Sequence, residues 1–200
     1  MTSPPPAPTA AGDRGHPAYV LLHADAERLL HAYQPADGQQ ELVRLDMLAH
    51  LRAHPDAMAR SGPPAHFTAS CLVFDPLLER VLLTHHRKAD QWFQFGGHLE
   101  VCDRSVRAGA QREALEESGV EGLRVTPFAV YLDRHALVGA FGRCAEHLDI
   151  RYAAVAPEGA RPAVSEESLD VRWWPVDALP GDGGLARPVA LARRAVAATA

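Results

Sequence analysis

Apolar residues recur at helical spacing in two segments near the N-terminus, residues 19–33 and 39–54. The turn-like residues Gln34 to Gly38 separate these segments. The pattern predicts a helical hairpin, because apolar positions three or four residues apart fall on one face of a helix. Such a stripe must be covered, and we expect the rest of the chain to cover it, with a second subunit as the alternative. The stripe comprises Leu21, Leu22, Leu29, Leu30, Leu42, Leu45, Leu48 and Leu51.

After His66 the pattern becomes typical of β-strands. A helix is expected near residues 112–118 and another at residues 185–198. This order predicts an α/β fold in which a mixed β-sheet is sandwiched between α-helices. Runs rich in apolar and β-branched residues predict strands at residues 67–74, 80–84, 123–132, 147–156 and 169–174.

The chain is expected to have three parts. Residues 1–17 are rich in proline and small side chains, so they cannot bury enough surface to fold alone and should form a disordered tail. Residues 18–62 should form the helical extension, packed on the main domain. Residues 63–200 should form that main domain, which agrees with the usual size of about 150 residues per domain.

Composition and charge exclude several classes of protein. The formal net charge of −5 argues against a basic platform for nucleic acid, although a local site could still hold a nucleotide. The N-terminus lacks the basic start and apolar run of a signal peptide, and no apolar run is long enough to span a membrane. Cys71, Cys102 and Cys144 lack metal-ligand spacing and are expected to be reduced thiols. We therefore expect a cytoplasmic protein that binds neither nucleic acid nor a membrane.

Candidate chemistry is concentrated on the helix near residue 115. Glu113, Glu116 and Glu117 fall within an arc of roughly 100° on that helix, where like charges repel. A hard divalent cation such as Mg²⁺ relieves this repulsion, because it prefers carboxylate oxygens and keeps positions for water and substrate phosphates. The cluster therefore indicates a site for phosphate chemistry, with a solvated acidic helix face as the alternative.

The residues around these glutamates resemble the Nudix box. That pattern is a glycine, five residues, a glutamate, seven residues and then R-E-U-x-E-E-x-G-U, where U is apolar. Residues 112–120 match the second half at every fixed position, and Gly97 with Asp103 matches the first half. Eight residues instead of seven follow Asp103, and an aspartate stands where the family has glutamate. The role of Asp103 is therefore open, and one alternative is that it caps the helix N-terminus.

The resemblance implies the Nudix fold and a hydrolase that needs Mg²⁺ or Mn²⁺. The expected reaction is cleavage of a diphosphate linkage in a nucleoside diphosphate derivative, such as a nucleotide sugar, a dinucleotide or a nucleoside triphosphate. One alternative is a nucleotide-binding or regulatory module without turnover, which the extra residue in the box favours. Another is an isoprenoid diphosphate isomerase, for which the sequence shows no supporting pattern.

By resemblance, metal ligands are expected at the backbone carbonyl of Gly96 and at the carboxylates of Glu113, Glu116 and Glu117. Glu167, just before the last expected strand, is a further candidate as metal ligand or base, with a solvated loop residue as the alternative. The catalytic candidates are Glu113, Glu116 and Arg112. In the family the arginine at the position of Arg112 orients a carboxylate, and the alternative is an ordinary surface ion pair.

Substrate-binding candidates lie outside the glutamate cluster. Arg87 could grip a phosphate with two parallel hydrogen bonds, and His85 lies on the same strand end. His98 directly follows the Gly-Gly turn and Glu100 lies two residues further on, while Asp149 lies on an alternating strand whose polar face also carries His147 and Arg151. That face either lines the substrate cleft or is the wet side of a sheet. The N-terminal hairpin makes a homodimer a reasonable hypothesis.

Overall fold

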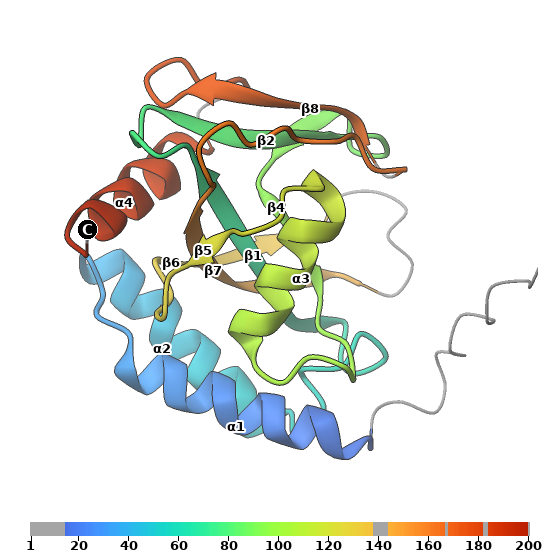
Figure 1. The fold of residues 1–200 in the computed structure, drawn as a ribbon. Coiled ribbons are helices and arrows are strands. Elements are labelled where there is room, and N and C mark those ends of the chain that lie inside the picture. The colour runs from blue at the N-terminus through green and yellow to red at the C-terminus, as the bar shows by residue number, and fades with distance from the viewer. Residues whose placement is uncertain (1–14, 138–143, 167, 182–183, 200) are drawn as a thin grey trace, which may run out of the picture.

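The computed structural model describes residues 15–137, 144–166, 168–181 and 184–199. Figure 1 shows how the helices surround a curved β-sheet. In chain order the elements are α1 (Pro17–Ala32), α2 (Gly38–Ala53), β1 (Ala65–Phe74), β2 (Arg80–His86), β3 (Gln91–Phe93), β4 (Phe95–His98), α3 (Val106–Ser118), β5 (Arg124–Val125), β6 (Tyr131–Ala136), β7 (Glu146–Val155), β8 (Ser168–Pro175) and α4 (Ala186–Ala197).

The described strands form one mixed sheet, which confirms the predicted α/β fold. Its main path runs β3-β2-β1-β7-β5, while β4 pairs with β1, β6 with β7 and β8 with β2. The pair β1–β7 is parallel and extends along the full length of β1, from Ala65 opposite Glu146 to Phe74 opposite Val155. All other pairs are antiparallel. Strand β1 is therefore the axis on which the sheet is built.

The two faces of β1 meet different surroundings, because successive side chains of a strand point to opposite faces. Phe67, together with every second residue after it up to Val73, packs in one apolar core with side chains of α1, α2 and α3. On the other face, Leu72 and Phe74 pack in a second core against Val189 and Ala192 of α4. The other side chains at alternate positions from His66 are polar, and two of them, Thr68 and Ser70, line the cavity described below.

The predicted helical hairpin is present and packs on the sheet core. Leu22 and Leu51 are buried in the same core as Phe67. The predicted stripe is only half covered, however, because Leu21 is 70% exposed and Leu42 is 65% exposed. None of the described helices is long and apolar enough to cross a membrane. Of the expected tail, residues 1–14 lie outside the described part of the chain.

One strand prediction was wrong, and two short strands were not predicted. The expected strand at residues 123–132 is interrupted between β5 and β6, because Pro127 has no N–H for the sheet and the hydroxyl of Thr126 donates to the carbonyl of Phe128 instead. Strands β3 and β4 were not predicted, since one is three residues long and the other contains Gly96 and Gly97. Both omissions lie beside the candidate site.

Gln40 ties the hairpin to the sheet and provides a test of that packing. Its buried side chain donates to the carbonyl of Leu132 and accepts from the amide of the same residue, both at 2.9 Å. We expect Gln40→Ala to lower the free energy of unfolding by about 1–3 kcal/mol, because it leaves buried backbone groups unpaired. Urea denaturation measures this, and the exposed Gln34→Ala should stay within about 0.5 kcal/mol of the parent. Equal midpoints for the two variants would show that the tie contributes nothing.

Candidate active site

The two glycines of β4 are required by close packing on both sides of the strand. Gly96 lies opposite Ser70 of β1, and a Cβ on Gly96 would overlap the Cβ of Ser70. A Cβ on Gly97 would lie 2.7 Å from Oε1 of Glu113 on α3. Glycine at position 96 is therefore explained by the sheet itself, whether or not its carbonyl meets a metal. Glycine at position 97 makes room for a carboxylate.

Helix α3 begins and ends at residues suited to these positions. Ser105 is the N-cap, and its hydroxyl accepts a hydrogen bond from the amide of Ala108 at 3.0 Å. Gly119 closes the helix with a φ of 65°, a left-handed conformation that favours glycine. The alternative in which Asp103 caps α3 is therefore wrong, and its carboxylate instead accepts from the amide of Glu100 at 2.8 Å.

Arg112 is the hub of the hydrogen bonds within the box, because its guanidinium donates to four other residues. It forms a two-pronged pair with Asp103, from Nε at 3.0 Å and from Nη2 at 2.9 Å. It also donates to the carbonyl of His98 at 3.0 Å, to Glu113 at 2.9 Å and to Glu116 at 3.0 Å. Its side chain is 17% exposed, so the alternative of an ordinary surface ion pair does not hold. One guanidinium thus joins the loop, β4 and two of the three clustered glutamates.

The three glutamates differ in their surroundings. Glu113 is largely buried between α3 and β4, and burial raises the pKa of its carboxyl to about 7. Glu116 is exposed, with its carboxylate toward Arg112. Glu117 is half-buried and lines a cavity of about 170 Å³, together with Gly96, Gly97 and residues of the sheet. The helix therefore presents carboxylates both to the guanidinium and to a cavity.

The floor of this cavity is a buried polar network on neighbouring strands. Asp149 of β7 accepts hydrogen bonds from Thr68 at 3.2 Å and from Ser70 at 2.5 Å. Arg151 donates to the same carboxylate at 3.1 Å and to Asp133 of β6 at 3.4 Å. Asp149 is 2% exposed and Arg151 is 4% exposed. The alternating face of β7 is therefore not the wet side of a sheet, and Asp149 lines the cavity.

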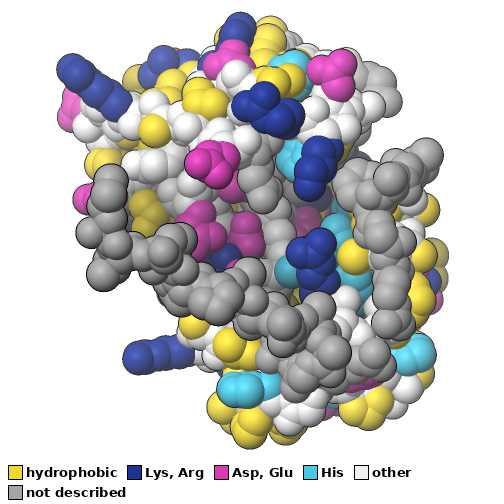
Figure 2. Space-filling view, turned by 90° about the vertical axis from the view of Figure 1, so that its right-hand side faces the viewer, with side chains coloured by type: hydrophobic (Ala, Val, Ile, Leu, Met, Phe, Trp, Pro, Cys, Tyr) yellow, Lys and Arg dark blue, Asp and Glu magenta, His cyan; other side chains and the backbone are white. Residues whose placement is uncertain are grey.

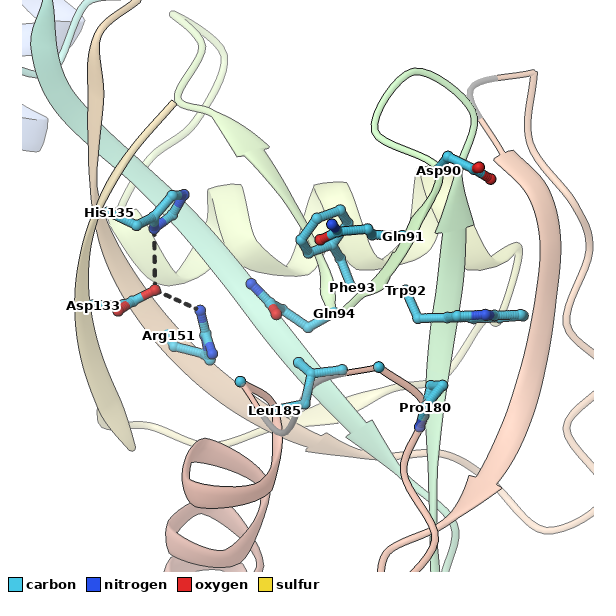
Figure 3. Close-up of a pocket in the computed structure, with 12 residues that line it drawn as sticks. Asp90, Gln91, Trp92, Phe93, Gln94, Asp133, His135, Arg151, Pro180 and Leu185 are labelled. Atoms are coloured by element: carbon cyan, nitrogen blue, oxygen red, sulfur yellow. Dashed lines mark hydrogen bonds and ion pairs between the residues drawn. The ribbon is translucent and has the colours of Figure 1, made fainter. Parts of the chain in front are cut away.

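A second, larger cavity adjoins the first. Its volume is about 440 Å³, and it shares Phe93, Gln94 and His135 with the smaller one. Figure 3 shows His135, Asp133 and Arg151 on one side of it and Trp92 with Asp90 on the other. Figure 2 shows that one face of the molecule is hollowed, with acidic side chains gathered in the hollow and basic and histidine side chains beside it.

Three of the predicted substrate-binding residues line neither cavity. Arg87 is exposed and donates to the main-chain carbonyls of Glu166 and Ser168, at 3.3 and 2.9 Å. His85 stacks on Trp92 with ring centroids 5.0 Å apart and lies 3.1 Å from Asp90. The third, Glu100, is exposed beside the box, 4.0 Å from Arg112. Their roles as substrate ligands stay predictions.

His98 lies outside the cavity lining as well, among other histidines. Its Nε2 is 3.0 Å from Nε2 of His66, and its ring centroid is 5.1 Å from that of His147. Burial lowers the pKa of His98 to about 3 and that of His147 to about 4, so both rings are neutral at pH 7. Glu167, the remaining predicted ligand, lies outside the described residues.

Several cavity residues were missed by sequence reasoning. Thr68 and Ser70 alternate with the apolar residues of β1, and this polar alternation was a signal that could have found them. Asp133 and His135 carry the same signal on β6. Gln94 lies between two short strands and gave no pattern.

The oxygen atoms around α3 fit a hard divalent cation. Glu113 and Glu116 already share one cation, the guanidinium of Arg112, and the room left by Gly97 keeps the Glu113 carboxylate against β4. Carboxylate and carbonyl oxygens are the ligands that Mg²⁺ and Mn²⁺ prefer. The donor set therefore suits either of these ions.

Comparisons with known proteins agree with this arrangement. A family model of the NUDIX domain matches residues 64–196. A C. elegans Ap4A hydrolase in a binary complex is 14% identical, covers 66% of this chain and 98% of its own, and superposes with a TM-score of 0.52. No curated protein matches the sequence significantly.

Two further solved structures have the same fold. The E. coli dihydroneopterin triphosphate pyrophosphohydrolase is 17% identical, with 63% of this chain and 92% of that chain covered and a TM-score of 0.51. The NUDIX domain of Shewanella oneidensis NrtR, complexed with ADP ribose, is 18% identical, with 65% and 87% covered and a TM-score of 0.50. At these identities the likeness shows the fold alone.

The hub role of Arg112 predicts a stability effect that a lysine cannot rescue. Arg112→Lys keeps the charge but loses the two-pronged pair with Asp103, so we expect it to lower the free energy of unfolding by about 2 kcal/mol. Guanidinium denaturation in chelator measures this. The control Glu116→Gln removes an exposed partner of the same arginine and should change stability by less than about 1 kcal/mol. A lysine variant as stable as the parent would contradict the hub role.

Proposed function

The chain belongs to the NUDIX domain family, and we propose that it is a pyrophosphohydrolase of the Nudix type that hydrolyses a diphosphate linkage in a nucleoside diphosphate derivative. One observation carries this proposal. Glu117 of the α3 glutamate cluster lines a small cavity that continues into a larger one through Phe93, Gln94 and His135. The larger volume, about 440 Å³, is within the usual range of about 300–1,000 Å³ for sites that hold small molecules.

The proposed metal is Mg²⁺ or Mn²⁺, held by Glu113, Glu116 and Glu117, with the carbonyl of Gly96 and Glu167 as further candidate ligands. When bound, the ion neutralises charge on phosphate oxygens and activates water. Arg112 fixes the carboxylates of Glu113 and Glu116 through hydrogen bonds of 2.9 and 3.0 Å, so it is a positioning residue in this scheme. A box carboxylate accepts the proton of the attacking water.

The two cavities divide the substrate between them in this proposal. The diphosphate occupies the small cavity, beside Glu117 and the glycines of β4. The remainder of the molecule extends past Gln94 into the larger cavity, where Asp133, His135 and Arg151 offer hydrogen-bonding groups. Asp149 is the predicted substrate residue best placed for contact, since it lines the small cavity.

No observation among the described residues favours the alternatives. The extra residue in the box was the feature that favoured a module without turnover. The loop before α3 accommodates it, because Arg112 still reaches Asp103 and Ser105 still caps the helix. Nothing in the cavity lining adds support for an isomerase. The hydrolase is therefore the function that we propose.

The first test is product release from a panel of ADP-ribose, dinucleotides, nucleotide sugars and nucleoside triphosphates, each with Mg²⁺, Mn²⁺ or chelator. ADP-ribose and Ap4A belong in it because one solved structure of this fold is a complex with ADP ribose and another is an Ap4A hydrolase. We expect metal-dependent cleavage of one class. Glu117→Gln should lower kcat by about 10²-fold or more, because a carboxylate at the reaction is lost. The exposed Glu121→Gln should retain the parent rate. No turnover with any substrate would overturn the proposal.

Gly97→Ala tests whether the room beside Glu113 matters for activity. The new methyl group would lie 2.7 Å from the Glu113 carboxylate and push it from its position. We expect kcat to fall by about 10²-fold, the usual consequence of moving a catalytic group by about 1 Å. A Cβ on Gly38 meets nothing within 4 Å, so Gly38→Ala is the matched control and should keep full activity. Equal rates for both variants would contradict the proposed role of Glu113.

A further inference from the structure

A cluster of histidines and a cysteine lies beside the cavity and plays no part in the proposed hydrolysis. Its members are His66, His98, His147 and Cys144, and one potential ligand atom from each lies within 4.8 Å of all the others. His66 is fully buried, and the other three are half-buried. Four nitrogen and sulfur ligands at this spacing form the kind of set that holds a transition metal.

Strand register brings these residues together. His66 of β1 lies directly opposite His147 of β7 in the parallel pair. His98 of β4 lies opposite Thr68, which is two residues from His66 and therefore on the same face of β1. The three rings have centroids between 5.0 and 5.3 Å apart. Cys144 lies just before β7, and its Sγ is 3.9 Å from Nε2 of His98.

The spacing fits a tetrahedral zinc ion. With Zn–N bonds of about 2.0–2.1 Å and Zn–S bonds of about 2.3 Å, neighbouring ligand atoms lie about 3.4–3.6 Å apart. Two pairs bracket this value, at 3.0 Å for His66 with His98 and 3.9 Å for Cys144 with His98. All four ligand atoms lie within 4.8 Å of one another, so shifts of about an ångström or less would bring them to tetrahedral spacing.

Hydrogen bonds around the cluster leave one ring nitrogen of His66 and one of His147 available for a metal. Nδ1 of His66 is 3.0 Å from the carbonyl of Pro63, which can only accept, so Nδ1 carries the proton and Nε2 of the neutral ring is bare. This second-sphere contact is typical of metal-binding histidines. Within the described part of the chain, Nε2 of His147 is buried and makes no hydrogen bond. A buried nitrogen without a partner costs free energy unless a ligand satisfies it.

We propose that His66, His98, His147 and Cys144 bind one Zn²⁺ ion in a site separate from the magnesium site of the box. The two sites differ in chemistry, since one offers nitrogen and sulfur and the other offers carboxylate oxygens. Zinc binding releases the thiol proton of Cys144, and each imidazole donates the lone pair of its unprotonated nitrogen. The bound ion links β1, β4 and β7, and it fixes His147, which also lines the small cavity.

The test is zinc binding to the full chain, first stripped of metal with chelator and then titrated with Zn²⁺ against a competing chromophoric chelator. We expect one equivalent of tight zinc that excess Mg²⁺ does not displace. Cys144→Ser and His66→Gln should weaken zinc binding about tenfold or more. The exposed Cys102→Ser and the box variant Glu117→Gln should bind zinc as the parent does.

Co²⁺ in place of zinc reports the ligands directly, because a folded variant that lacks only the thiolate should keep visible cobalt bands, whereas a misfolded variant should lose them all. The parent protein and Cys102→Ser should show the intense visible bands of tetrahedral cobalt together with thiolate-to-cobalt charge transfer. Cys144→Ser should lose the charge-transfer band. The proposal is overturned if the parent binds no zinc, if its cobalt form lacks the thiolate band, or if Glu117→Gln abolishes zinc binding. None of these outcomes bears on whether the box hydrolyses a diphosphate.

Discussion

The pairing of β1 with β4 on one edge and with β7 on the other positions every candidate site in this protein. Because side chains alternate along a strand, this register places His66, Thr68 and Ser70 of β1 on one face. A slip of one residue would move these polar groups into the core occupied by Phe67 and would expose that core instead. The parallel β1–β7 ladder extends along all of β1, so the polar face is specified by the longest continuous pairing in the sheet. The cavity is thus a consequence of sheet register.

The guanidinium of Arg112 offsets the repulsion between the glutamate carboxylates of the box. Glutamates three and four residues apart on a helix repel one another, and burial makes the charged form of Glu113 more costly still. Arg112 offsets this by pairing with Glu113 and Glu116 while Asp103 holds the guanidinium from the other side. The aspartate that departs from the family pattern therefore takes a structural part. The side chain of Asp103 is shorter than that of glutamate, and the loop that follows it is one residue longer than in the family pattern. In this loop the Asp103 carboxylate lies within hydrogen-bonding distance of Arg112.

Much of this could be predicted from the sequence, and the exceptions have physical reasons. The helices, the long strands and the acidic cluster on α3 all carry local signals, namely periodicity and spacing. Strand β4 does not, because its two glycines are poor strand formers that are selected by contacts with Ser70 and Glu113. Arg87 and His85 were predicted to bind substrate because they are basic and lie at the end of a strand. In the structure, Arg87 donates to main-chain carbonyls and His85 stacks on Trp92. Which side chains meet across strands is not encoded locally.

The histidine cluster shows this limit most sharply. Cys144 was expected to be a reduced thiol, because no other cysteine lies near it in the sequence, and His147, three residues further on, was read only as part of an alternating strand. Its neighbours come from three strands instead, and 78 positions separate His66 from Cys144 along the chain. Alternation along β4 keeps the two chemistries apart, since Gly97 faces α3 while His98 points to the opposite face, toward His66. Adjacent residues of one short strand can therefore serve a carboxylate site and a nitrogen–sulfur site, and neither donor set needs to compete for the metal of the other.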